Sequence, residues 1–154
     1  MLINIYTDGS CRNNGTKDAV GAWGYVALSN NQNDILTQDC AKCIGTTNQR
    51  MELEAVIEAC QWTLTQALGP FDEVYIYTDS AYLHNCYMQK WYENWRANGW
   101  KNSKKQPVAN QDLWEQLIPF FEDIKYHFYK TQGHTGIYWN EYVDTMVQNK
   151  SAEV

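Results

Sequence analysis

The sequence lacks the features of secreted and membrane-spanning proteins. No apolar run approaches the roughly 20 residues that a helix needs to cross a bilayer. The first residues alternate in polarity and reach an aspartate at Asp8, which is unlike a signal peptide. There is no linker or low-complexity tract, and 154 residues suit one domain with a core of ordinary size. We therefore expect a single domain over residues 1–154, in the cytosol and not associated with membranes.

Cysteine is too scarce and too unevenly spaced for a disulfide framework. Five cysteines, an odd number, come without a secretion signal. Cys40 and Cys43 form a lone C-x-x-C pair, whereas a zinc site needs two further ligands, and none follows at a suitable spacing. Reduced thiols are the favoured interpretation. A cysteine-based zinc or redox protein stays as an alternative that rests on this pair alone.

Basic residues are also scarce, which argues against an enzyme that acts on nucleic acid. The formal net charge is −6, whereas phosphate binding depends on lysine and arginine. The distribution weakens this objection, because the segment from Lys90 to Lys105 carries a formal charge of +4 and the rest of the chain carries −10. Acidic residues gathered around a metal site would give such a distribution.

The apolar pattern predicts a mixed α/β (α+β) fold. Short alternating runs indicate strands, and apolar residues at helical spacing indicate helices. The first three strands are joined by short loops, which indicates an antiparallel meander. A tryptophan-rich stretch between the second and third helices looks irregular. The predicted strands are 2–7, 20–29, 34–44, 74–78 and 124–129, and the predicted helices are 48–68, 81–90, 110–122 and 139–149.

One tetrapeptide occurs twice. Ile5–Asp8 and Ile76–Asp79 both read I-Y-T-D, and we expect each to close a strand with its aspartate. A helical crossover lies between them, so the two strands can run parallel. If they are neighbours, Asp8 and Asp79 emerge at the same carboxyl edge of the sheet, where open α/β sheets usually build their sites.

Two carboxylates held close together need a proton or a cation between them. Magnesium suits such a site because it takes hard oxygen ligands and keeps several waters. Two ions about 3.5–4 Å apart can activate a water and stabilise a leaving oxygen during phosphodiester cleavage. This chemistry requires three or four carboxylates around one cleft.

Three further residues could join this pair, and each has a plainer interpretation. Glu52 lies at the flank of the apolar stripe of its helix. It could interact with another group at the edge of the buried face, or it could simply be favoured by the dipole at the start of the helix. Asp144 lies off the apolar stripe of the last helix, and the residues alone favour a solvated face. His134, in the loop Gly133–Gly136, could carry a proton, although an exposed loop histidine without a role is commoner.

Five short segments, taken in order, resemble the motifs of ribonuclease H type 1. A single T-D-G-S is a weak signal, but five motifs at suitable spacing are a strong one. The middle of the chain also resembles the family's basic protrusion and the helix after it, so the likeness covers about residues 2–147. The segments are Asp8–Cys11, Thr46–Val56, Tyr77–Ser80, Gly133–Gly136, Asn140–Asp144 and, for the protrusion, Trp91–Trp114.

The resemblance implies a ribonuclease H-like fold, with a five-stranded mixed sheet and helices on both faces. It implies an endonuclease that hydrolyses the RNA strand of RNA–DNA hybrids with Mg²⁺ or Mn²⁺, two ions per site, leaving 5′-phosphate and 3′-hydroxyl ends. His134 would help to protonate or release the product. The implied metal ligands are Asp8, Glu52, Asp79 and Asp144.

The resemblance also implies two substrate-binding regions. Asn14, Asn48 and Gln49 match positions that contact the strands, and short amides suit 2′-hydroxyls and base edges. A second group would hold the DNA backbone, although we expect some of its tryptophans to serve only local packing. This second group is Trp91, Trp95, Arg96, Trp100, Lys101, Lys104 and Lys105.

The chain departs from the family pattern in three places. Ala81 stands where a glutamine is frequent, the protrusion has fewer basic residues than strongly basic members, and the segment 130–132 before the histidine loop is altered. We expect weaker hybrid affinity and a shallower salt dependence than in those members. A related polynucleotidyl transferase and a non-catalytic hybrid-binding module are the alternatives. We expect a monomer.

Overall fold

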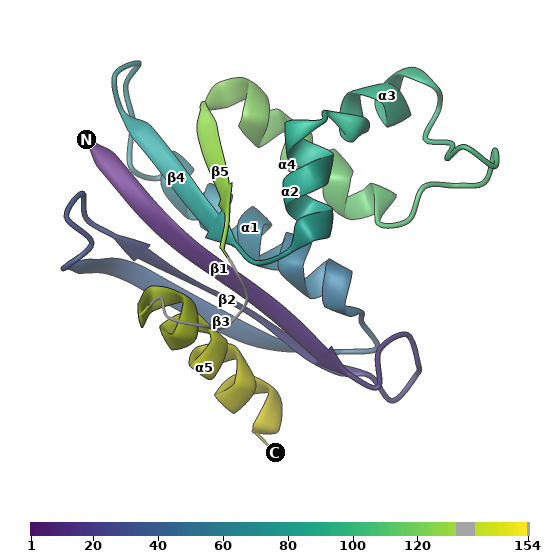
Figure 1. Cartoon of the computed structure of the whole chain (residues 1–154), viewed down its shortest axis with the longest axis horizontal. Helices are drawn as coiled ribbons and strands as arrows, with labels where there is room; N and C mark the ends of the chain where they lie inside the picture. The colour runs from purple at the N-terminus through teal and green to yellow at the C-terminus, as the bar shows by residue number, and fades with distance from the viewer. Residues whose placement is uncertain (132–137, 154) are drawn as a thin grey trace.

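A computed structural model describes residues 1–131 and 138–153, and it has ten regular elements (Figure 1). None of the helices in these two ranges has the length and apolar character needed to cross a bilayer. The elements are β1 (Leu2–Arg12), β2 (Val20–Leu28), β3 (Ile35–Ile44), α1 (Asn48–Leu64), β4 (Glu73–Thr78), α2 (Ala81–Met88), α3 (Trp91–Ala97), α4 (Gln111–Asp123), β5 (Tyr126–Lys130) and α5 (Tyr138–Ala152).

The five strands form one mixed sheet in the order β3-β2-β1-β4-β5. The first three strands pair antiparallel, which confirms the predicted meander. β4 pairs parallel to β1, with Ile5 opposite Ile76 and Tyr6 opposite Tyr77. The two copies of I-Y-T-D therefore lie side by side and in register, as the repeat predicts.

Alternate strand residues face two helical layers, which confirms helices on both faces of the sheet. On one face, Ile5 and Ile76 belong to a core cluster that also includes residues of α1 and α4. On the other face, Tyr6 and Val26 pack against Val143 of α5. Figure 1 shows α5 lying across the strands of the meander, while β4 and β5 extend beyond it.

The predicted boundaries differ most from the structure at the ends of β1 and α1. β1 does not end at Asp8 but continues to Arg12, because its antiparallel pairing with β2 runs on to that residue. Asp8 is still next to the end of β4, because the parallel pairing of the two strands stops at Tyr6 and Tyr77. The helix predicted to reach residue 68 ends at Leu64, ahead of the Gly69–Pro70 stop signal.

The tryptophan-rich stretch is more regular than the sequence suggests. It contains a short helix, α3, in which Tyr92 is buried and stacks on Trp114 of α4 with 6.0 Å between the ring centroids. The segment after α3, residues 98–107, projects from the body of the molecule (Figure 1). Trp95 of α3 also contacts Trp114, so aromatic packing of α3 against α4 holds the base of this projection.

The C-x-x-C pair does not form a joint site. Cys40 lies opposite Gly24 on the face that α5 covers, since a Cβ atom at Gly24 would meet both Cys40 and Val147. Cys43 packs against the core on the other side of the sheet. Residues separated by three positions in a strand point to opposite faces, and all five thiols are free. The zinc or redox alternative has no support in this geometry.

Candidate active site

Asp8 and Asp79 come from the two central parallel strands. Asp8 lies within β1 and is buried, and Asp79 directly follows Thr78, the last residue of β4. The Thr78 hydroxyl accepts a hydrogen bond from the Ser80 N–H (3.1 Å), and the Ser80 hydroxyl in turn caps α2 at Leu83 N–H (3.1 Å). These local bonds fix the turn that carries Asp79.

Glu52 reaches the same place from α1. The helix begins after Thr47, whose hydroxyl accepts a hydrogen bond from the Arg50 N–H (3.1 Å). It then packs so closely on β1 that a Cβ atom at Gly9 would lie 2.3 Å from the Met51 carbonyl carbon. Only a glycine permits this approach, and it places Glu52, which is 9% exposed, in the first turns of the helix and next to Asp8.

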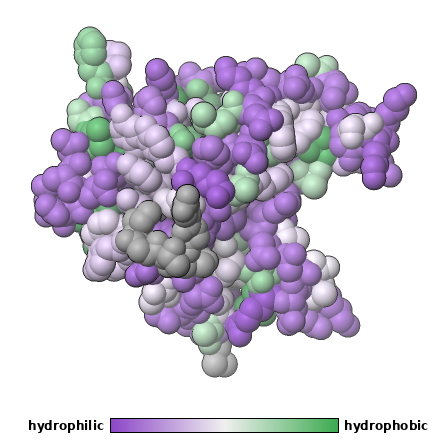
Figure 2. Space-filling view, in the orientation of Figure 1, coloured by the Kyte–Doolittle hydropathy of each residue, from purple (hydrophilic) through white to green (hydrophobic). Residues whose placement is uncertain are grey.

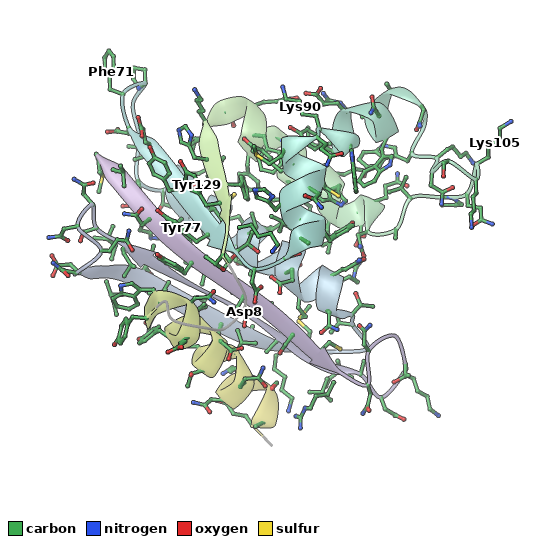
Figure 3. All side chains as sticks on the ribbon, viewed as in Figure 1. Asp8, Phe71, Tyr77, Lys90, Lys105 and Tyr129 are labelled. Atoms are coloured by element: carbon green, nitrogen blue, oxygen red, sulfur yellow. The ribbon has the colours of Figure 1, made fainter. Side chains whose placement is uncertain are left out.

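One carboxylate oxygen from each of Asp8, Glu52 and Asp79 lies within 4.8 Å of the other two. Within the ranges that the structure describes, this is the one group of three or more potential ligand side chains that could hold a metal ion. Figure 3 shows Asp8 at the centre of the sheet, where β1 passes the end of β4. The predicted meeting of Asp8 and Asp79 is therefore found, and Glu52 joins them.

Burial and mutual repulsion perturb these carboxyl groups strongly. Burial, together with the charges of Asp79 and Asp144, raises the pKa of Asp8 from 3.8 to about 8. Burial and the charge of Asp8 raise the pKa of Glu52 well above its usual value. A hydrogen bond from the Gly9 backbone opposes both shifts but does not cancel them. Such a cluster is stable at neutral pH only with bound protons or bound cations.

The hydrogen bonding of the cluster fits a cation. Among the residues that the structure describes, two buried side-chain oxygens have no hydrogen-bond partner. They are Asp8 Oδ2 and Glu52 Oε2. A buried carboxylate oxygen without a donor is costly. Hard divalent ions such as Mg²⁺ and Mn²⁺ take carboxylate oxygens as ligands, so the donor set suits the implied metal.

Asp144 lies on α5 and approaches the cluster from the opposite face of the sheet. Its charge and a hydrogen bond between the two carboxyl groups both contribute to the raised pKa of Asp8. It is half-buried and is not among the three groups within 4.8 Å of one another. The solvated-face interpretation is therefore wrong for Asp144. His134 and its loop lie outside the described residues.

The three predicted strand-contacting amides gather at one cavity of about 490 Å³. Asn14, in the loop between β1 and β2, accepts a hydrogen bond from the Asn48 N–H at the start of α1 (2.8 Å). Gln49 lines the same cavity. Figure 2 shows the outline of the molecule notched between the projection and the body.

Two further polar residues of this cavity were not predicted as substrate contacts. Thr47 and Asn110 line it, and Asn110 donates a hydrogen bond to Gln49 Oε1 (3.3 Å). Asn110 precedes α4 with a left-handed backbone (φ 64°). An asparagine just before a helical pattern is a weak signal by itself, because capping explains it equally well.

The predicted DNA-binding residues, which lie in α3 and in the projection after it, divide into packed and exposed groups. Trp95 and Trp100 are half-buried and pack against the core, as expected for some of the tryptophans. Arg96 pairs with Glu122 of α4 (3.0 Å), so its charge is partly compensated. Trp91 and the lysines of the projection are exposed, and Figure 3 shows Lys105 at the outer tip, away from Asp8. The exposed lysines are Lys101, Lys104 and Lys105.

This fold and site define an α/β protein with a carboxylate cluster that could hold a metal ion, located where the parallel strands β1 and β4 meet. Comparisons with known proteins give the family. The RNase H family model matches residues 2–152. The chain is 46% identical over 148 residues to a ribonuclease H of Syntrophomonas wolfei subsp. wolfei, covering 96% of this chain and 94% of that protein. The chain belongs to the RNase H family.

Solved structures agree with this assignment. LC9-RNase H1, described as a type 1 RNase H with the type 2 active-site motif, superposes with a TM-score of 0.78 at 27% identity, covering 97% of this chain and 72% of that one. The foamy viral protease-reverse transcriptase in complex with an RNA/DNA hybrid also superposes with a TM-score of 0.78, at 26% identity. That match covers 99% of this chain and 20% of the viral one.

Proposed function

We propose that this protein is an endonuclease that hydrolyses the RNA strand of RNA–DNA hybrids with two divalent ions. The observation that carries the proposal is the convergence of Asp8, Glu52 and Asp79, two of which hold a buried oxygen without a partner. Family membership supports the substrate, and the viral relative was solved with a hybrid bound. A non-catalytic binding module would have no need for such a costly cluster.

The proposed ligands are Asp8, Glu52, Asp79 and Asp144. Two ions held there would lower the pKa of an attacking water and stabilise the leaving oxygen, so that cleavage leaves a 5′-phosphate and a 3′-hydroxyl. Asp8 is the central residue of this set. Its charge raises the pKa of Glu52, and the charges of Asp79 and Asp144 raise the pKa of Asp8. His134 is proposed to help to protonate or release the product.

Substrate recognition is proposed to use two regions of the surface. Asn14, Asn48 and Gln49 are assigned to the sugar and base edges in the shallow groove of the hybrid, where the 2′-hydroxyl distinguishes RNA from DNA. The projection is assigned to the DNA backbone, with its exposed lysines and Trp91 as the contacting residues. Trp95, Trp100 and Arg96 would act there mainly by holding the projection in place.

The whole chain is proposed to act as one catalytic domain and as a monomer. Five free thiols suit a reducing compartment, so we place this activity in the cytosol.

The test is cleavage of a hybrid with labelled RNA by the wild type and by Asp8→Asn, with Mg²⁺ and with a chelator. We expect cleavage of RNA only, in the presence of Mg²⁺ only, and almost none by the variant. Ligation of an adaptor that requires a 5′-phosphate identifies the ends. Equal cleavage of duplex DNA, or cleavage that the chelator does not reduce, would overturn the proposal.

A further inference from the structure

Thr131 connects two elements that carry different carboxylates. It directly follows β5 and is 6% exposed. Its backbone N–H donates a hydrogen bond to the Thr78 carbonyl (2.7 Å), and its hydroxyl donates one to Asn140 Oδ1 (3.3 Å). The two partners are themselves buried, at 0% and 2% exposed.

Each partner is next to a proposed metal ligand. Thr78 immediately precedes Asp79, and its hydroxyl also holds the turn after Asp79 through Ser80. Asn140 is four residues before Asp144 in α5, so the two side chains lie on the same side of the helix, one turn apart. Thr131 therefore contacts the strand end that carries Asp79 and the helix turn below Asp144.

Three other long-range hydrogen bonds of α5 run to a different part of the sheet. Arg12 donates to the Ser151 carbonyl (2.8 Å), and Tyr142 donates to Gln38 Oε1 (2.6 Å). Trp139 donates to the Gln32 carbonyl (3.0 Å). All of these fasten the helix to the β1–β3 side of the sheet, whereas the Thr131 hydroxyl bond fastens it to the β4–β5 side, where Asp79 lies.

We infer that Thr131 is a positioning residue that sets the separation of the Asp79 and Asp144 carboxylates and thereby the affinity for divalent ions. The inference rests on the proposed function, which assigns both residues as ligands. A neutral hydroxyl suits this place because it donates a hydrogen bond without adding a charge that would compete with a metal ion for the carboxylates. Groups behind a metal site commonly act in this way.

The test compares Thr131→Val, which keeps the shape but removes the hydroxyl, with Thr131→Ser, which restores it. Thr131→Ala is the second variant should valine fail to fold. Thr63→Val is the matched control, because the Thr63 hydroxyl is likewise buried and hydrogen-bonded, to the Cys60 carbonyl and the Tyr126 hydroxyl, but lies near the far end of α1. The measurements are the rise of the melting temperature with Mn²⁺, the Mg²⁺ concentration for half-maximal cleavage, and the KM for the hybrid.

We expect Thr131→Val to need about tenfold more Mg²⁺ and to show a smaller Mn²⁺-induced rise, with an unchanged KM. Serine should restore the wild-type metal response, and Thr63→Val should lose stability without changing it. A normal metal response in Thr131→Val or Thr131→Ala, or an equal defect in Thr63→Val, would refute the inference. If the wild type cleaves no hybrid, the proposed function fails, and the Mn²⁺-induced rise still decides whether Thr131 positions the site.

Discussion

A Cβ atom at Gly9 would lie 2.4 Å from the backbone nitrogen of Glu52. This contact between a strand and a helix is what brings the Glu52 carboxyl group beside Asp8, the residue before the glycine. The Gly9 backbone also supplies a hydrogen bond that lowers the pKa of both carboxyl groups. One residue without a side chain thus sets both the approach of α1 and part of the electrostatic balance of the site.

Gly9→Ala should therefore damage stability and activity together. The added methyl group meets backbone atoms of Met51 and Glu52 that cannot move without shifting the helix, and overpacking of this kind costs about 1–3 kcal/mol. Urea unfolding and hybrid cleavage measure the two effects. Gly69→Ala is the control, because its nearest neighbouring atom lies 3.7 Å away. Full activity in Gly9→Ala would show that Glu52 does not depend on this contact.

Asp8→Asn should separate stability from activity. Without metal, the buried Asp8 carboxyl group must take up a proton at neutral pH because its pKa is raised from 3.8 to about 8. The amide is neutral without that proton, so the metal-free variant should gain on the order of a few kcal/mol of unfolding free energy, while cleavage is almost lost. Added Mg²⁺ should stabilise the wild type more than the variant. If the variant is less stable than the wild type in the presence of a chelator, burial and the neighbouring carboxyl groups do not destabilise the fold through Asp8.

The sequence identifies this site better than it locates its surroundings. The repeated I-Y-T-D predicts that Asp8 and Asp79 are neighbours, because the repeat and a helical crossover are local features that imply parallel pairing. It does not reveal that β1 runs on to Arg12, because that extension depends on pairing with β2, and the D-G-S signal locally resembles a turn.

Asp144 and Asn110 show the other limit. A helical pattern gives the position of Asp144 relative to the apolar stripe of its own helix, but not the strands on which that helix docks. The docking of α5 is a tertiary property, set by contacts such as Val143 with Tyr6 and Val26. Asn110 meets Gln49 only because α1 and α4 pack side by side, and nothing in either segment alone indicates it.

The pH dependence of the metal-free protein follows from the raised pKa of Asp8. A group whose pKa rises from 3.8 to about 8 on folding stabilises the fold while it is protonated, and loses that contribution as the pH rises through the folded value. With a chelator present, the unfolding free energy of the wild type should fall relative to Asp8→Asn between about pH 4 and about pH 8, that is between the unfolded and the folded pKa of Asp8. A constant difference between the two proteins over this range would contradict the raised pKa.

The projection should contribute to affinity through its exposed lysines. Replacing Lys101, Lys104 and Lys105 by alanine should raise the KM for the hybrid and make its salt dependence shallower, by up to about 0.7–0.9 in logarithmic slope per lost phosphate contact. Arg96→Ala should have a smaller effect on the slope, since Glu122 already compensates its charge. An unchanged slope in the triple variant would remove the projection from the binding surface.

The most direct test of the account is an anomalous-scattering map from crystals of the wild type soaked in Mn²⁺. It should show an ion bound by oxygens of Asp8, Glu52 and Asp79 at about 2.0–2.2 Å, as expected for a hard cation of this size, with Asp8 Oδ2 or Glu52 Oε2 among the ligands. A map with no peak between these three carboxyl groups, from crystals that bind Mn²⁺ elsewhere, would contradict it.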